Sequence, residues 1–261
     1  MTSETPSAET PPLALTFHGT AREYFRVWLP GACLTWLTLG LFSAWASVRR
    51  GRYLLARTKL DGLPFEYQAR AFPLLLGRAC LLVALGLVWV AFQLPSVGPW
   101  VLAGCACVLP HALVRVARFV ARSRTYCGEP GEFTGSARSF FFAVTPVLVC
   151  AALSTGQVLA ALHHYLRPFS DAHPILVALP YCALCLWVLV SMETTVRNVV
   201  AKHTHWGSLS FDSRLETGAM VWLHLTNGLA TLASLGLLIP WAEIRARRYR
   251  LSRLRALSVA H

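Results

Sequence analysis

The side chains of this sequence best placed to do chemistry are polar and ionisable residues inside long apolar stretches. His224 and Asn227 lie three residues apart in the apolar segment 219–241, and His111 lies in the apolar segment 99–116. A polar group at membrane depth is costly unless it is paired or hydrated, so it often marks a solute or proton pathway. Histidine also exchanges protons near neutral pH. We therefore predict a candidate solute or proton site at His224, Asn227 and His111. The alternative is a histidine bonded to the carbonyl of a neighbouring helix.

A second pattern combines arginines with aromatic residues and occurs twice. Residues 38–53 recur without a gap at residues 234–249, which share Leu39, Gly40, Leu41, Trp45, Ala46, Arg49, Arg52 and Tyr53 of the first copy. Arginines beside apolar segments contact anionic headgroups, and aromatic rings anchor helices at the membrane interface. The predicted interface anchors are Trp45, Tyr53, Trp241 and Tyr249. A functional alternative is that Arg49, Arg52, Arg245 and Arg248 bind an anionic lipid headgroup or solute.

Other reactive residue types do not form recognisable catalytic or metal-binding patterns. The sequence has no Gly-x-Ser-x-Gly elbow and no Gly-x-x-x-x-Gly-Lys phosphate loop. Cys182-x-x-Cys185 stands without a second cysteine pair, and Glu193 and Arg197 have the spacing of a structural ion pair on one helix face. We expect no enzyme activity, no catalytic residue, no cofactor and no metal site.

The composition is that of a polytopic membrane protein. Of the 261 residues, 55% are hydrophobic and 14% are charged, whereas soluble domains are about a quarter charged. The formal net charge is +12, and the basic residues gather beside the apolar segments. That arrangement fits the cytoplasmic positive-charge bias and anionic phospholipids. No nucleic-acid-binding motif is present, so nucleic acid is not an expected partner.

Hydropathy and charge together predict the membrane topology. Four segments of about 20 residues are expected to span the bilayer: 72–94, 99–116, 140–162 and 174–195. Two repeat-related segments, 24–45 and 219–241, contain Pro30-Gly31 and Asn227-Gly228, which favour a helix break. If both segments re-enter, every basic cluster lies in the cytoplasm. Six plain crossings, with an exception to the positive-inside rule, are the alternative.

A shorter repeat in the basic loops predicts strands. Thr58, Thr125 and Thr204 each precede a glycine by three or four residues, and a phenylalanine follows. We expect a helix, a glycine turn and a short strand in each loop, and the strands would pair into a small cytoplasmic sheet. Independent polar loops are the alternative. The fold class is therefore mainly α, with short strands. Residues 1–16 are predicted as a disordered tail, and residues 17–257 as one membrane domain with an internal repeat, 24–67 and 219–257.

These motifs resemble the YjgN family of bacterial inner-membrane proteins. The similarity rests on Phe17-x-Gly, Leu-Thr-Leu-Gly40, Trp45-Ala-x-x-Arg-x-x-Arg-Tyr53 and the loop Gly62-x-x-Phe65, and it extends loosely to about residue 257. Ser234 replaces the motif threonine in the second copy. The resemblance implies a multi-pass protein of the bacterial inner membrane. It brings no known activity, catalytic residue or ligand.

Two functions of different classes are compatible with this sequence. One is a transporter or channel for a small solute or ion, and the other is a structural or lipid-organising membrane protein. A wet cavity that reaches His224 and Asn227 would favour transport, whereas a packed bundle without a cavity would favour the structural role. The expected partners are the lipid bilayer and anionic phospholipids, and self-association into a homo-oligomer is left open.

Overall fold

The computed structural model describes residues 15–93, 96–147 and 174–258. Its labelled helices are α1 (Ala21–Leu37), α2 (Ser43–Ala56), α3 (Ala71–Phe92), α4 (Gly98–Arg122), α7 (Pro174–Lys202), α8 (Thr217–Ala233) and α9 (Ile239–Ser252). A further helix begins at residue 137 and is described as far as residue 147. The strands are β1 (Leu15–Phe17), β2 (Thr58–Leu60), β3 (Leu63–Pro64), β4 (Glu66–Tyr67), β5 (Arg124–Tyr126), β6 (Glu129–Pro130), β7 (Glu132–Phe133), β8 (Thr204–Trp206), β9 (Leu209–Ser213) and β10 (Leu254–Ser258). The prediction of a mainly helical protein with short strands is confirmed.

The described residues form four units of one design, in which an incoming strand, helical residues and an outgoing strand follow one another. In each unit the incoming strand pairs with the outgoing strand antiparallel: β1 with β2, β4 with β5, β7 with β8, and β9 with β10. The residue just after each incoming strand also donates its backbone N–H to the carbonyl at the end of the last helix. These bonds run from His18 to Arg57, Gln68 to Ser123, Thr134 to His203 and Arg214 to Arg253. The repeat is therefore fourfold, whereas the sequence indicated one long repeat and three loop motifs.

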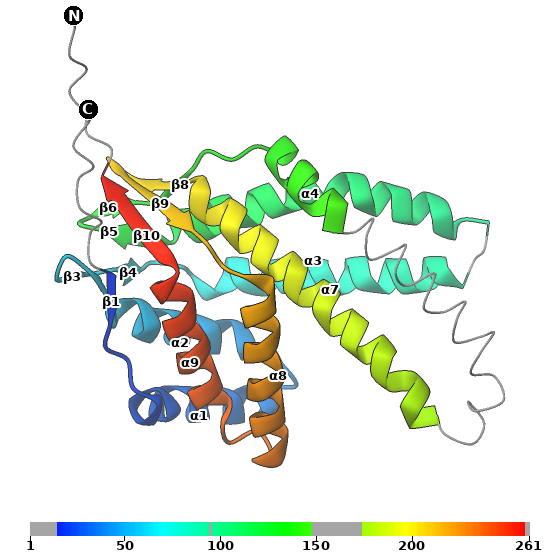
Figure 1. The fold of residues 1–261 in the computed structure, drawn as a ribbon, viewed down its shortest axis with the longest axis horizontal. Coiled ribbons are helices and arrows are strands. Elements are labelled where there is room, and N and C mark those ends of the chain that lie inside the picture. Colours follow the sequence, from blue (N-terminus) through cyan, green and yellow to red (C-terminus); the bar gives the residue numbers. More distant parts are fainter. Residues whose placement is uncertain (1–14, 94–95, 148–173, 259–261) are drawn as a thin grey trace, which may run out of the picture.

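The strands form three small sheets at one end of the molecule, which we call the strand cap (Figure 1). Their orders are β1-β2-β3, β4-β5-β6 and β10-β9-β8-β7. The chain passes from the first sheet to the second at Phe65, which is buried with Leu60, Trp206 and Phe211. The Phe65 ring lies 5.8 Å from that of Trp206. The prediction that the loop strands pair is confirmed, and the alternative of independent polar loops is wrong. The strands form three sheets, however, and not the single sheet that was predicted.

The N-terminal boundary of the fold differs slightly from the prediction. Leu15 and Thr16, which the composition assigned to the tail, belong to β1 and pair with Leu60 and Lys59 of β2. The rest of the predicted tail lies outside the described residues. Strand β1 forms because it pairs with β2, whose apolar side chains are already buried in the cap. This pairing joins distant segments, so the local composition does not reveal it.

The two repeat-related segments are helical hairpins, and their reversal points differ from those predicted. Helices α1 and α8 continue through Pro30-Gly31 and Asn227-Gly228. The chain turns instead at residues 38–42 and 234–238, where Leu39 and Gly40 have φ of 50° and 95° and the matching pair in the second copy has 50° and 89°. The predicted breaks are wrong because one proline removes only one helical bond, and the left-handed pair of residues after the helix ends it.

The motif hydroxyl at the helix end stabilises each turn. Thr38 Oγ1 donates to the Leu34 carbonyl at 2.8 Å and accepts from the Phe42 N–H at 3.0 Å. Ser234 Oγ donates to the Thr231 carbonyl at 3.1 Å and accepts from the Leu238 N–H at 3.0 Å. The serine hydroxyl therefore donates one hydrogen bond and accepts one, as the threonine hydroxyl does, and this explains why the second copy tolerates the replacement.

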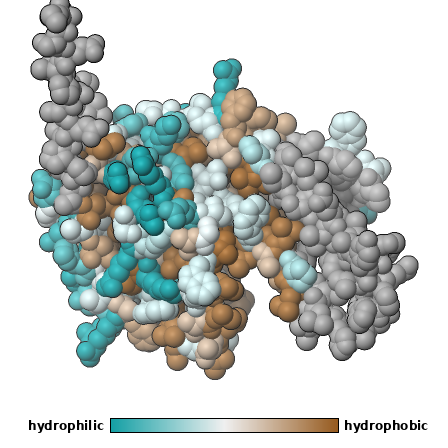
Figure 2. Space-filling model, viewed as in Figure 1, coloured by the Kyte–Doolittle hydropathy of each residue, from teal (hydrophilic) through white to brown (hydrophobic). Residues whose placement is uncertain are grey.

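Helices cover the described parts of all four segments predicted to span, but four spanning helices are not confirmed. Among the described residues, two helical stretches are long and apolar enough to cross a membrane: Ala71–Val90 in α3 and Cys182–Lys202 in α7. Most of segment 140–162 lies outside the described residues. In Figure 1, α3, α4 and α7 extend away from the strand cap beyond the shorter hairpins. In Figure 2, hydrophobic residues gather over the lower end of this face, where the α8–α9 hairpin turns.

Candidate functional site

His224 is held between its own helix and α7. Its Nδ1 lies 2.8 Å from the Met220 carbonyl, and its Nε2 lies 3.1 Å from Glu193 Oε2. Glu193 Oε1 in turn accepts from Arg197 Nε at 2.7 Å, so the predicted Glu193–Arg197 pair is present. Both ring nitrogens thus lie within hydrogen-bonding distance of oxygen atoms. The neighbouring-helix partner of His224 is a carboxylate, not the carbonyl that the alternative expected.

Asn227 turns to the other side of α8 and contacts α9. Its Nδ2 donates to the Ala242 carbonyl at 3.2 Å, and its Oδ1 accepts from Arg245 Nη1 at 2.9 Å. His111 lies on α4, is exposed, and has its Nδ1 3.3 Å from the Cys107 carbonyl of the same helix. The structure therefore does not gather His224, Asn227 and His111 into one site.

The eight arginine and aromatic residues of the repeated motif have different surroundings in the two copies. Arg49 and Arg52 are exposed, whereas Arg245 binds Asn227 and Arg248 Nη2 donates to the Gly19 carbonyl at 3.1 Å. Trp45 and Trp241 are 44% and 40% exposed, so both rings lie on the surface. The Tyr53 hydroxyl donates to Glu23 Oε2 at 3.0 Å. The Tyr249 ring packs on a buried cluster with Met220, and its buried hydroxyl has no hydrogen-bond partner among the described residues.

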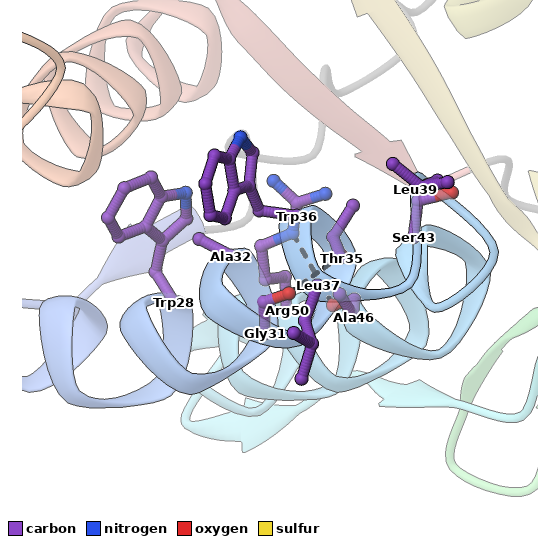
Figure 3. Close-up of a pocket in the computed structure, with 11 residues that line it drawn as sticks. Trp28, Gly31, Ala32, Thr35, Trp36, Leu37, Leu39, Ser43, Ala46 and Arg50 are labelled. Carbon is purple, nitrogen blue, oxygen red and sulfur yellow. Dashed lines mark hydrogen bonds between the residues drawn. The ribbon is translucent and has the colours of Figure 1, made fainter.

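A groove of about 750 Å³ lies between the two helices of the first hairpin. Trp28, Gly31, Thr35 and Trp36 line it from α1, and Arg50 is the charged residue of its lining. Figure 3 shows the rings of Trp28 and Trp36 on the same side of α1, with the Arg50 guanidinium reaching toward Trp36 from α2. Arg50 Nη2 donates to Ser47 Oγ at 3.1 Å, which leaves further N–H groups of the guanidinium for other partners.

The two hairpins differ at matching positions that line the groove in the first hairpin. Trp28 and Gly31 occupy in the first hairpin the places that His224 and Asn227 occupy in the second. A Cβ atom at Gly31 would lie 3.0 Å from the Ala46 Cβ, so the absence of a side chain lets α1 and α2 approach closely. In the second hairpin the Asn227 side chain fills this place and bonds α9.

A second group of arginines lies where the helices meet the strand cap. Arg124 in β5 and Arg247 in α9 have buried Nε atoms that lack a hydrogen-bond partner among the described residues. Burial, followed by the positive charges of Arg124, Arg250 and Arg197, lowers the pKa of Arg247 to about 9. Burial and the charge of Arg197 lower the pKa of Arg250 to about 10. These guanidinium groups therefore remain charged at neutral pH and lie close enough to repel one another.

Sequence reasoning missed this arginine cluster, which we define as Arg124, Arg197, Arg247 and Arg250. One signal was available, because Arg247 and Arg250 replace Gly51 and Leu54 of the first copy of the repeat. Places where a repeat changes from small or apolar to basic are candidates for a function that one copy has acquired. The convergence of Arg124 with α9 depends on contacts between distant segments and was not readable from spacing.

Comparison with known proteins identifies the family. The family model for bacterial proteins of unknown function (DUF898) matches residues 12–173 and 170–260. The chain belongs to this family. Its relatives include the inner membrane protein YjgN of Salmonella typhimurium, 27% identical over 144 residues, and that of Escherichia coli K12, 36% identical over 59 residues. These matches cover 53% and 23% of this chain and 36% and 15% of the relatives. The matched regions thus span about a third of the Salmonella relative and less than a sixth of the Escherichia coli relative. No solved structure matches the chain.

The described residues also bear on metal chemistry. Within the ranges 15–93, 96–147 and 174–258, no group of three or more His, Cys, Asp or Glu side chains could hold a metal ion.

Proposed function

We propose that this protein is a multi-pass component of the bacterial inner membrane that binds anionic phospholipids at the cytoplasmic leaflet and has no enzyme activity. The observation that carries the proposal is the groove of the α1–α2 hairpin. Its walls are apolar apart from Thr35 and Ser43, and its charged residue is Arg50. An acyl chain fits the walls, and an anionic headgroup complements the guanidinium.

The lengths of the two helices support a hairpin that enters one leaflet of the bilayer and places the groove there. Helices α1 and α2 have 17 and 14 residues, so they are about 25 Å and 21 Å long, shorter than a hydrocarbon core of about 30 Å. Both ends of the hairpin join strands of the cap, β1 and β2. A re-entrant hairpin follows, with the strand cap in the cytoplasm, and the α8–α9 hairpin has the same arrangement between β9 and β10.

The exposed hairpin tips support the same topology. Leu39 and Leu235, at matching positions of the two turns, are 96% and 95% exposed. Trp36 and Leu232 nearby are 85% and 75% exposed. Apolar side chains exposed to this degree are stable inside lipid. The names of the YjgN relatives support an inner-membrane location. On this topology α3, α4, α7 and the segment from residue 137 cross the membrane.

Transport of a small solute or ion is the second candidate function. It is favoured by the buried arginines, which could accept an anion, but the polar residues expected to line a pathway are engaged with neighbours. His224 is bonded to Glu193, and Asn227 is bonded to Ala242 and Arg245. The groove of the first hairpin is lined by α1, α2 and the turn between them, and its lining does not include either residue. We therefore favour lipid binding.

The experiment compares lipid retention by two neighbouring arginine variants. The protein is purified in nanodiscs that contain equal amounts of phosphatidylglycerol and phosphatidylcholine, and the lipids that remain after detergent extraction are quantified by mass spectrometry. We expect the wild type and Arg49→Gln to retain phosphatidylglycerol preferentially, whereas Arg50→Gln loses the preference. Arg49 is exposed and carries the same charge, so it controls for net charge. An equal preference in Arg50→Gln would contradict the proposal.

Liposome flux assays distinguish the transport function from the lipid-binding function. Vesicles with the folded protein are compared with empty vesicles for the movement of small anions and of fluorescent phospholipids. Anion flux that persists in Arg50→Gln would favour transport over lipid binding at the groove. Phospholipid movement that requires Arg50, without anion flux, would support the lipid function.

A further inference from the structure

The arginine cluster lies at the junction of the helices and the strand cap. Arg247 Nη2 donates to Thr58 Oγ1 of β2 at 3.4 Å, and Trp206 Nε1 of β8 donates to the Arg124 carbonyl at 3.1 Å. Strands from three of the four units therefore surround the cluster from the side of the cap. The positive charge of Arg197 in α7 also acts on the cluster and lowers the pKa of both Arg247 and Arg250.

The positive charge of the cluster exceeds the negative charge around it. In the part of the chain that the structure describes, the carboxylates that act on Arg247 and Arg250 are those of Glu193 and Glu243. Glu193 already pairs with Arg197 and His224, and Glu243 accepts the hydroxyl of Tyr24. A buried charge without full compensation destabilises a folded protein, and a buried donor without a partner costs further free energy.

The helix ends around the cluster supply part of the missing compensation. Helices α2, α4, α7 and α9 all end at the cap, where their C-terminal carbonyls carry partial negative charge. Arg250 lies in the last turn of α9 and donates its Nε to the Ala246 carbonyl at 3.1 Å. Partial negative charge at a helix end favours a nearby guanidinium group. It provides no hydrogen-bond acceptor for the buried Nε atoms of Arg124 and Arg247.

We propose that the arginine cluster binds a phosphate group or a similar tetrahedral oxyanion. Guanidinium groups donate in pairs to such oxygens, and these charge-assisted bonds are stronger in a partly dehydrated site. An oxyanion at this place would neutralise the excess charge and accept from the unpartnered N–H groups. Access is available at the edge of the cluster, where the Arg197 side chain keeps 42% of its surface exposed.

The proposed oxyanion site is separate from the lipid groove and does not depend on it. The groove uses Arg50 on the first hairpin, whereas the cluster uses β5, α7 and the last turns of α9. On the proposed topology the cluster faces the cytoplasmic end of the helices. The phosphate group could belong to a soluble cytoplasmic ligand or to a phospholipid headgroup, and the two sources share the chemistry of binding.

The test measures binding of inorganic phosphate to the full chain in nanodiscs of phosphatidylcholine. Isothermal titration calorimetry at constant ionic strength, with chloride as the control anion, should give one phosphate per chain. Phosphate should also raise the melting temperature of the wild type by several degrees, because a ligand that binds the folded state stabilises it. Absence of heat and of any melting shift beyond that with chloride would overturn the proposal.

Two variants and one matched control locate the site. Arg247→Gln and Arg250→Gln should each lose the phosphate-dependent melting shift, whereas Arg52→Gln, which removes an exposed charge of the same sign, should keep it. Without phosphate, Arg247→Gln should be at least as stable as the wild type, since it removes a repelling charge. Replacement of an arginine with only a structural role would not combine loss of the phosphate-dependent shift with undiminished stability in the absence of phosphate. An undiminished phosphate shift in both variants would refute the assignment.

The source of the phosphate group is distinguished by changing the lipid. If the melting shift persists in nanodiscs with phosphatidylglycerol, the site takes a soluble phosphate. If phosphatidylglycerol abolishes the shift in the wild type and stabilises it without added phosphate, the headgroup occupies the cluster. Either result supports an oxyanion site at these arginines.

Discussion

The contact between Tyr24 and Glu243 joins the α1–α2 hairpin to the α8–α9 hairpin and gives a quantitative prediction. Tyr24 lies in α1 with 0% of its surface exposed, and its hydroxyl donates to Glu243 Oε2 in α9. Its ring packs against Leu54 and Ile244. The substitution Tyr24→Phe keeps these ring contacts and removes the hydroxyl, so it isolates the hydrogen bond between the hairpins.

The magnitude follows from the charge of the acceptor. A hydrogen bond to a charged group contributes about 1.5–3 kcal/mol, and its loss leaves a carboxylate oxygen without this donor. We therefore expect Tyr24→Phe to destabilise the protein by about 2 kcal/mol. For a chain of this size that corresponds to a decrease in melting temperature of about 4–8 °C.

A second tyrosine of the same buried cluster provides the control. The Tyr53 hydroxyl donates to Glu23 at 3.0 Å, but Glu23 also pairs with Arg57 at 3.0 Å on the surface. The substitution Tyr53→Phe should therefore cost less than about 1 kcal/mol. Both variants are measured by tryptophan fluorescence during thermal unfolding in nanodiscs.

A double-mutant cycle completes the assay. If the hydroxyl acts through Glu243, Tyr24→Phe should cost much less in a Glu243→Gln background than in the wild type. A decrease for Tyr24→Phe no larger than that for Tyr53→Phe would show that the hairpins are not coupled by this contact. Equal costs of Tyr24→Phe in both backgrounds would also refute the reasoning.

Three further predictions concern the second hairpin, the turns and the topology. Asn227→Ala removes the bonds to Ala242 and Arg245 and should lower the stability by about 1–3 kcal/mol in the same melting assay. Gly40→Ala should cost about 1–3 kcal/mol because its φ is 95°; Gly77→Ala in α3, where a Cβ meets open space, should not destabilise. A C-terminal reporter should be active only in the cytoplasm, and activity on the periplasmic side would contradict the re-entrant hairpins.

The sequence by itself determined the helical class, the long repeat and the position of the loop strands. Apolar segments of bilayer length predict helices because a helix satisfies its own backbone bonds in lipid. The Thr58, Thr125 and Thr204 motifs follow the ends of helices. In two of them the threonine hydroxyl bonds a carbonyl one turn back, as Thr58 Oγ1 does to Leu54 at 2.8 Å and Thr204 Oγ1 does to Val200 at 2.5 Å. These signals lie within short stretches of residues, so they can be recognised in a single sequence.

The turn position shows where local signals mislead. Pro30 and Asn227 favour a break in an isolated helix, but packing of α1 on α2 and of α8 on α9 keeps both helices intact. The reversal falls instead at Leu39 and Leu235, where leucines adopt positive φ before a glycine. At the predicted breaks, the tertiary contacts therefore outweighed the low helix propensity of proline and glycine, which costs about 1–3 kcal/mol per residue.

Only the tertiary structure decided which polar residues meet. His224 and Asn227 share a segment, yet one contacts α7 and the other contacts α9, because residues three apart on a helix can still face different neighbours. Arg124 and Arg247 are separated by most of the second half of the chain, yet their charges interact beneath the strand cap. Such meetings depend on how the four units pack, and that packing is set by long-range burial that no local spacing encodes.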